Sequence, residues 1–233
     1  MSKVKLCVFS DYHYCPALYP QDQSGLDTII ERAHTADADV ILECGDLAAD
    51  ATKNDGFLQK FLNNKYGIKT AFCYGNHELE QVDSLELLNK AYGVDNSYFY
   101  RDMFGFRFIT IDTNFWYDDD GTFYHYPGRG VGSPKGWGYD QNMLGEKQLE
   151  WLSESIDKSE LPCIIIGHNP MEKSDKDEHK RFMKILLDLL YEDIGKSFYK
   201  VKCDMYKKYP NGFYVYAEKK KFKNIKSCIE YVT

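Results

Sequence analysis

The chain has 233 residues, 43% of them hydrophobic, and a formal net charge of −7. No Pro-, Gly- or Ser-rich linker divides it, so one domain with a substantial core is the simplest organisation. The negative charge argues against nonspecific binding to nucleic-acid backbones, which requires a basic surface. The first strand-like run begins close to the N-terminus, and no apolar run approaches the roughly 20 residues of a membrane helix, so we expect a cytoplasmic protein without a membrane partner.

Short apolar runs alternate with amphipathic stretches along most of the chain. The runs are rich in β-branched residues and short enough for buried strands: Val4–Ser10, Val40–Cys44, Thr70–Tyr74 and Cys163–Ile166. A hairpin is predicted from Phe99–Tyr100 and Phe106–Ile111. Apolar residues at helical spacing predict helices over Leu26–Thr35, Phe57–Asn63, Ser84–Ala91, Leu144–Asp157 and Glu178–Tyr191. Alternation of strands with helices predicts a layered α/β fold.

A long stretch from Asp112 to Asn142 combines many aromatic residues with many glycines. So long an irregular segment in a compact domain is usually functional or disordered, and its aromatic content argues against disorder. We interpret it as a wall or lid of a substrate pocket, with Arg129 and Lys135 as candidate phosphate contacts. A packed insertion is the alternative interpretation. Asp112 itself is assigned a structural role.

Four polar clusters directly follow the four predicted strands. They are Asp11-Tyr12-His13, Gly45-Asp46, Gly75-Asn76-His77-Glu78 and Gly167-His168. In sheets of this kind, ligands gather outside the carboxyl ends of the strands, so clusters distant in sequence are expected to converge. Carboxylate, imidazole and amide groups are together the ligands of a pair of divalent transition metals.

The four clusters, in this order and each after a strand, resemble the calcineurin-like metallophosphoesterase superfamily. The resemblance runs from Leu6 to about Pro170. It implies a four-layer αββα sandwich, in which two mixed sheets pack face to face and helices flank them, with an atypical C-terminal part. It also implies hydrolysis of a phosphate mono- or diester by a hydroxide that bridges two metals.

The resemblance also implies a ligand set. Asp46 would bridge the two metals, Asp11 and His13 would bind the first, and Asn76 and His168 would bind the second. Manganese, iron and zinc all suit these ligand types, which do not select among them.

A separate role is implied for His77, which stands beside the metals in this superfamily and is not a ligand. It would stabilise the transferring phosphoryl group and protonate the leaving oxygen, for which an imidazole has a suitable pKa. Asp50 is a candidate to orient the imidazole of His77.

The C-terminal part departs from the superfamily pattern. The expected Gly-His-x-His, with both histidines as ligands, is absent, since the last histidine is His179. Spacing puts the missing motif near Val201–Lys208, where Cys203 or Asp204 could substitute as a ligand. We therefore predict a metallophosphoesterase domain over 1–195 and a Lys-rich segment over 196–233, which has diverged, supplies unusual ligands or is an altered sequence.

The substrate is expected to be a small phosphate ester. The Gly-Asp-x-x-Asp-Arg-Gly form of the related protein phosphatases is absent after Gly45, which disfavours protein substrates. The sequence does not indicate an oligomeric state. An alternative is a weak or inactive protein of this fold that serves as a binding scaffold, but a scaffold has no need of His77.

Overall fold

The computed structural model describes residues 3–15, 24–49, 55–79, 82, 84–117, 123–125, 143–169, 171 and 176–192. Asp50, Arg129, Lys135 and the segment Val201–Lys208 lie outside these residues, so the hypotheses about them stay predictions. Contacts along the backbone divide the chain into two units, Met1–Lys180 and Arg181–Thr233. The predicted boundary at residue 195 also lies outside the described residues. All strands among the described residues, and the candidate site, belong to the first unit.

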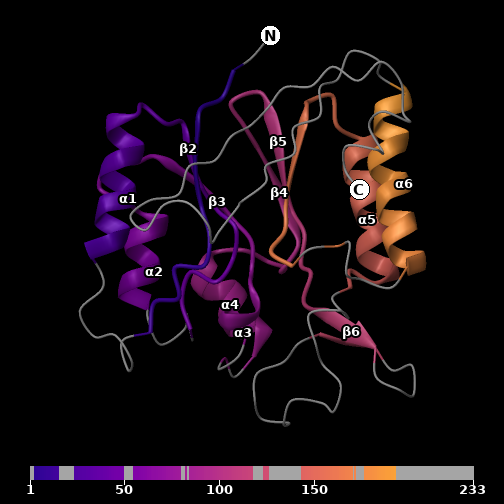
Figure 1. Ribbon diagram of the computed structural model, residues 1–233, viewed down its shortest axis with the longest axis horizontal. Helices are drawn as coiled ribbons and strands as arrows, with labels where there is room; N and C mark the ends of the chain where they lie inside the picture. Colours follow the sequence, from indigo (N-terminus) through magenta and orange to yellow (C-terminus); the bar gives the residue numbers. More distant parts are fainter. Residues whose placement is uncertain are drawn as a thin grey trace, which may run out of the picture. The chain divides into compact units, whose positions relative to one another are not determined.

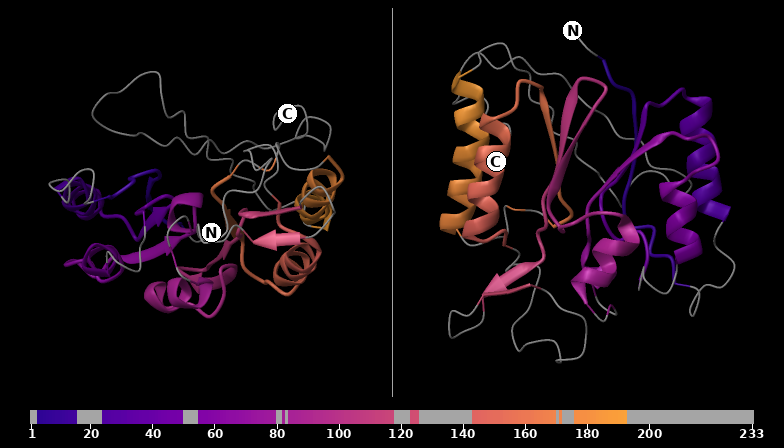
Figure 2. Two further views of the ribbon diagram at one scale, coloured as in Figure 1. Left: turned by 90° about the horizontal axis from the view of Figure 1, so that it is seen from below. Right: turned by 180° about the vertical axis from the view of Figure 1, so that it is seen from behind.

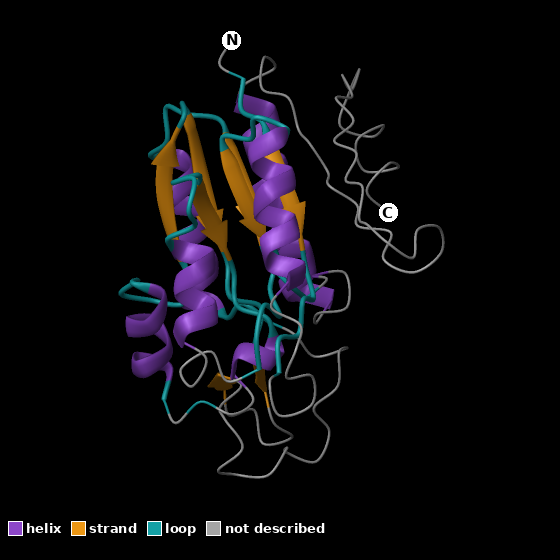
Figure 3. Cartoon of the chain, turned by 90° about the vertical axis from the view of Figure 1, so that its left-hand side faces the viewer, coloured by secondary structure: helices purple, strands orange, loops and turns teal. Residues whose placement is uncertain are grey.

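The first sheet contains three parallel strands in the order β1-β2-β3 (Figure 1). They are β1 (Leu6–Phe9), β2 (Val40–Glu43) and β3 (Lys69–Phe72). Val8 pairs with Leu42, and Leu42 pairs with Ala71. Because the strands are parallel, their carboxyl ends lie at one edge of the sheet, as the direction of the arrows in Figure 3 shows.

The second sheet has the order β4-β5-β8 and is mixed. Its strands are β4 (Phe99–Met103), β5 (Phe106–Thr110) and β8 (Cys163–Ile166). The predicted hairpin is present, since β4 and β5 are antiparallel neighbours. β5 and β8 are parallel, with Thr110 opposite Ile166, so both end on the same side.

The inner faces of the two sheets form one apolar layer. Along β2, Val40 and Leu42 pack in the cluster that also contains Phe108 of β5 and Ile166 of β8. Ile41, between them, belongs to the other cluster, because successive side chains of a strand point to opposite faces. A strand buried on both faces explains why Val40, Ile41 and Leu42 are all apolar.

Helices cover the outer faces of both sheets (Figure 2). On the first sheet lie α1 (Ser24–Thr35), α2 (Asp55–Leu62) and α4 (Leu85–Tyr92). α5 (Glu146–Asp157) covers the second sheet, where the guanidinium of Arg107 donates to the backbone oxygen of Ser155 at 2.8 Å. The predicted four-layer fold class is therefore confirmed. α6 (Lys176–Glu192) crosses the boundary between the two units.

One local expectation needed correction. The stretch after Asp112 contains a short antiparallel hairpin, β6 (Phe115–Tyr117) with β7 (Phe123–His125). Trp151 is half-buried, and its ring centroid lies 4.9 Å from that of Tyr98. His179 is half-buried, with Nδ1 2.9 Å from the backbone oxygen of Met171. No helix among the described residues is long and apolar enough to cross a membrane.

Candidate metal centre

Two loops at the carboxyl ends of β1 and β2 are joined by backbone hydrogen bonds. The N–H of Asp11 donates to the oxygen of Gly45 at 3.0 Å, and the N–H of His13 donates to the oxygen of Asp46 at 2.8 Å. The ladder between the strands thus continues into the loops. It places Asp11, His13 and Asp46 next to one another, as the positions at the strand ends predict.

The backbone is strained at these same three residues. Asp11, His13 and Asp46 have φ values of 56°, 53° and 64°, in the left-handed region that residues other than glycine rarely adopt. Such strain costs on the order of 1–3 kcal/mol per residue and clusters at functional sites. Its concentration on three predicted ligands supports a functional role for these loops.

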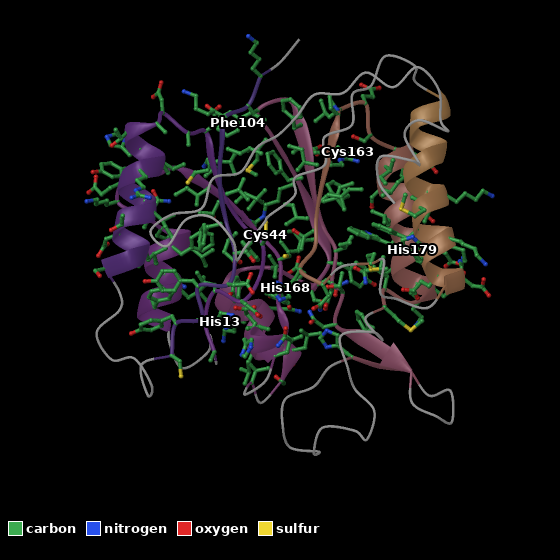
Figure 4. The ribbon with its side chains drawn as sticks, viewed as in Figure 1. His13, Cys44, Phe104, Cys163, His168 and His179 are labelled. Carbon is green, nitrogen blue, oxygen red and sulfur yellow. The ribbon has the colours of Figure 1, made fainter. Side chains whose placement is uncertain are left out.

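One carboxylate oxygen, Oδ2 of Asp46, faces three imidazoles. It lies 3.2 Å from Nε2 of His168, 3.7 Å from Nε2 of His13 and 4.0 Å from Nε2 of His77. Asp46 is buried, and Figure 4 shows His13 and His168 near each other at the end of the sheets, with His179 apart from them. Oδ1 of Asp11 lies 3.6 Å from Nε2 of His13. The structure therefore brings together five of the predicted site residues, which are Asp11, His13, Asp46, His77 and His168.

The ligand atoms form two groups that share Asp46. One group is His13, Asp46 and His77, and the other is Asp11, Asp46 and His168; within each, the candidate ligand atoms lie within 4.8 Å of one another. Imidazole with carboxylate is a donor set that binds divalent transition metals. A carboxylate common to both groups fits the bridging role predicted for Asp46.

Asn76, the remaining predicted ligand, is buried at the start of the short helix α3 (Asn76–Leu79). The preceding residue, Gly75, abuts Asp46: a Cβ atom on Gly75 would lie 2.1 Å from Oδ1 of Asp46. The close approach explains the glycine and puts Asn76 beside the shared carboxylate.

Neighbouring groups fix how two of the ligands are oriented. Nδ1 of His168 lies 2.9 Å from the backbone oxygen of Cys44, which leaves Nε2 directed at Asp46. The hydroxyl of Ser10 donates to Oδ2 of Asp11, which leaves Oδ1 toward His13. Hydrogen bonds of this kind orient metal ligands and set their tautomers. Neither Ser10 nor Cys44 was a candidate from sequence, since apolar strand ends do not show which carbonyl a histidine will meet.

Glu78 connects the loops that follow β2 and β3. Its fully buried carboxylate accepts three backbone N–H groups, from Asp46 at 2.9 Å, Ala48 at 2.9 Å and Gly75 at 2.7 Å. Burial and the charge of Asp46 raise the pKa of Glu78 to about 7, while the three N–H donors oppose the increase. Glu78 thus holds the ends of β2 and β3 in register around the site.

Comparisons with known proteins bear on the family and the fold of the chain. The family model for calcineurin-like phosphoesterases matches residues 4–193. The chain belongs to the calcineurin-like phosphoesterase family. Among solved structures, a dimetal phosphatase from Danio rerio is similar in fold, with a TM-score of 0.55 and 15% identity over 81% of this chain and 78% of that chain. No curated protein sequence matches.

Membership of the calcineurin-like phosphoesterase family confirms the family and fold expected from the sequence motifs. At the level of the family, the chain is a phosphoester hydrolase with candidate metal ligands. The individual roles of Asp11, His13, Asp46, Asn76, His77 and His168 stay predictions.

In this phosphoesterase, Gly45 makes room for His168. Gly45 has a φ of 95°, and a Cβ atom there would lie 2.5 Å from Nδ1 of His168. We expect Gly45→Ala to displace the imidazole and weaken binding of Mn²⁺ by about tenfold or more, as loss of a group that orients a ligand typically does. Isothermal titration calorimetry measures the affinity. Gly56→Ala is a matched control, because nothing lies within 4 Å of a Cβ at Gly56; equal effects of the two substitutions would contradict this account.

The charge of Asp46 strongly affects His168. Burial alone lowers the pKa of an imidazole, but the hydrogen bond and the charge of Asp46 raise the pKa of His168 to about 9. Burial likewise opposes the charge of Asp46, yet the hydrogen bond and charge of His168 lower its pKa overall. Without a metal, the two groups therefore form an ion pair near neutral pH.

This ion pair predicts how Mn²⁺ stabilises the protein at different pH values. The contribution of protonated His168 to stability is complete below its ordinary pKa of 6.5 and is lost as the pH rises through about 9. A metal must displace that proton, so its affinity rises over the same interval. We expect Mn²⁺ to raise the midpoint of thermal unfolding more at about pH 8.5 than at about pH 6.5. An equal or smaller increase at the higher pH would contradict the assignment.

Proposed function

We propose that this protein hydrolyses small phosphate mono- or diesters with two divalent metal ions. The observation that carries the proposal is the position of buried Asp46, whose Oδ2 atom faces His13, His77 and His168 at 3.7, 4.0 and 3.2 Å. A carboxylate placed between two groups of ligands is what a dinuclear centre requires.

The predicted ligands fit such a centre by their chemistry. Asp11 and His13 would hold one ion, Asn76 and His168 the other, and Asp46 both. Manganese, iron and zinc are the candidate metals, as their preferences for nitrogen and oxygen ligands overlap. When bound, two such ions lower the pKa of a bound water and neutralise the charge of the ester oxygens.

His77 is the candidate for protonation of the leaving group. Its backbone N–H donates to Oδ1 of Asp46 at 2.9 Å, which ties the position of His77 to that of the shared carboxylate. Its side chain is 31% exposed, so the ring is accessible to a substrate. We assign to it stabilisation of the phosphoryl group and protonation of the leaving oxygen. Orientation of His77 by Asp50 stays a prediction.

Hydrolysis of two generic esters tests the proposal. We expect the purified protein to hydrolyse p-nitrophenyl phosphate, bis(p-nitrophenyl) phosphate or both, to lose this activity on chelation and to recover it with Mn²⁺. Metal content measured on the same samples shows whether loss of metal accompanies loss of activity. Turnover that persists after complete removal of metal would refute the two-metal mechanism.

A second candidate function follows from the C-terminal sequence. The missing Gly-His-x-His favours a weakly active or inactive protein of this fold that binds a partner. A protein that retains metal but hydrolyses neither ester would favour this scaffold function.

A further inference from the structure

A second buried carboxylate, Asp112, lies at the same end of the sheets as the metal centre. It follows β5, which is parallel to β8, and β8 leads to His168. Asp112 has no exposed surface, and its Oδ1 accepts the backbone and side-chain N–H groups of Asn114 at 3.0 and 2.9 Å. Its other oxygen, Oδ2, lies 2.6 Å from Nε2 of His125 in β7. The residue assigned a structural role therefore forms a carboxylate–imidazole pair.

The pair requires a proton on Nε2 of His125. Burial opposes the charge of Asp112, but the charge and hydrogen bond of His125 lower its pKa, so Asp112 is a carboxylate near neutral pH. A carboxylate only accepts, and Nε2 of His125 must therefore donate. Nδ1 has no hydrogen-bond partner among the described residues, and the side chain is 18% exposed. His125 thus has one nitrogen held and one nitrogen available.

Hydrogen bonds connect this pair to two of the ligand-bearing loops. The side-chain amide of Asn114 donates to the backbone oxygen of Tyr74 at 3.1 Å, two residues before Asn76. The side-chain amide of Asn169, which directly follows His168, donates to Oδ1 of Asn114 at 3.1 Å. Asn114 therefore links Asp112 to both loops. Figures 1 and 2 show β6, the partner of β7, at the end of the sheets where α3 lies.

We propose that His125 is a phosphate-contacting residue of the metal centre, with Nδ1 donating a hydrogen bond to a nonbridging oxygen of the bound phosphate. The inference rests on the proposed function, because it places the phosphate at the metals. With a proton on both ring nitrogens, His125 would donate in two directions, to Asp112 and to the phosphate, and charge-assisted hydrogen bonds of this kind are the strong ones. The rival role for His125 is purely structural, as a clasp between the β6–β7 hairpin and Asp112.

Two substitutions distinguish a phosphate contact from a purely structural role of His125. In His125→Gln, the side-chain amide can still donate to Asp112 and hold the hairpin, but it has no second N–H at the position of Nδ1. In His125→Ala, both hydrogen bonds are lost. Binding of inorganic phosphate to the Mn²⁺-loaded protein, measured by calorimetry, should weaken about tenfold or more in both variants, the usual effect of losing a hydrogen bond to a charged group. Mn²⁺ binding should be that of the wild type.

The outcomes decide the proposal in each case. Wild-type phosphate affinity in His125→Gln with weakened affinity in His125→Ala would identify a clasp and overturn the inference. Unchanged affinity in both variants, or loss of Mn²⁺ binding in both, would overturn it as well. His34→Ala is the control, since His34 is exposed on α1 and stacks on Tyr66.

Failure of the inference is distinguishable from failure of the proposed function. The calorimetric measurement needs no turnover, so a wild-type protein that binds phosphate but hydrolyses no ester refutes the function alone. A protein that hydrolyses esters but shows the same phosphate affinity after His125→Gln refutes the contact alone. Absence of phosphate binding by the Mn²⁺-loaded wild type also refutes the contact.

Discussion

We expect Asp46→Asn to reduce ester hydrolysis by about 10³-fold or more, because the proposed pair of metals would lose its shared carboxylate and with it several kcal/mol of transition-state stabilisation. In the wild type, the backbone N–H of His77 donates to Oδ1 of Asp46 at 2.9 Å. The asparagine side chain has the same shape, and its oxygen can still accept this hydrogen bond. The amide nitrogen would then occupy the place of Oδ2, where it cannot bind a cation. Steady-state kinetics with p-nitrophenyl phosphate and metal analysis of the same variant check this result.

A control substitution separates charge loss in general from loss of the bridge. Asp27→Asn removes a half-exposed carboxylate of α1 that pairs with Lys60 at 2.6 Å, and it should leave turnover and metal content unchanged. Turnover by Asp46→Asn within a few-fold of wild type would refute the bridging role. Far-UV circular dichroism establishes that each variant is folded.

His77→Ala should lower turnover by about 10²–10⁴-fold, the usual contribution of general acid–base catalysis. The loss should be larger for phenyl phosphate than for p-nitrophenyl phosphate, because phenolate is the more basic leaving group and depends more on a proton. Metal content should stay near that of the wild type. His34→Ala, which removes an exposed imidazole, serves as the matched control.

The structure also offers a direct challenge to this assignment. Nε2 of His77 belongs to one of the two groups of candidate ligand atoms, together with His13 and Asp46. Loss of one equivalent of metal from His77→Ala would therefore make His77 a ligand. Equal losses of rate for the two esters would remove the general-acid role.

The sequence predicted the scaffold and most of the candidate site because both depend on local patterns. An apolar run such as Val40–Cys44 is buried on both faces, and the predicted strand differs by one residue from β2. A helix was also predicted over Ser84–Ala91; it is observed as α4, and the side chain of its N-cap Ser84 accepts the N–H of Leu87 at 3.2 Å. Polar residues directly after strands converge because the strands are parallel, which needs no knowledge of side-chain positions.

Interactions between distant loops were not predictable in the same way. Nothing in the sequence around Glu78 shows that its carboxylate accepts N–H groups from residues 30 and 32 positions earlier. The β6–β7 hairpin has three-residue strands within a Gly- and Tyr-rich stretch, too short for a periodic signal. The pairing of Asp112 with His125 depends on that hairpin and was therefore missed as well.

The buried carboxylate of Glu78 has a consequence for which ion is found in the protein. Its three N–H donors come from the chain itself, so the loops that carry Asp46 and Asn76 keep their form when an ion leaves. Sites that fold only around their metal make exchange costly, whereas a site that is already formed lets ions replace one another by affinity and supply. We therefore expect the metal recovered from a purified sample to reflect both affinity and the supply in the growth medium, so reconstitution with each ion in turn is needed to rank them by activity.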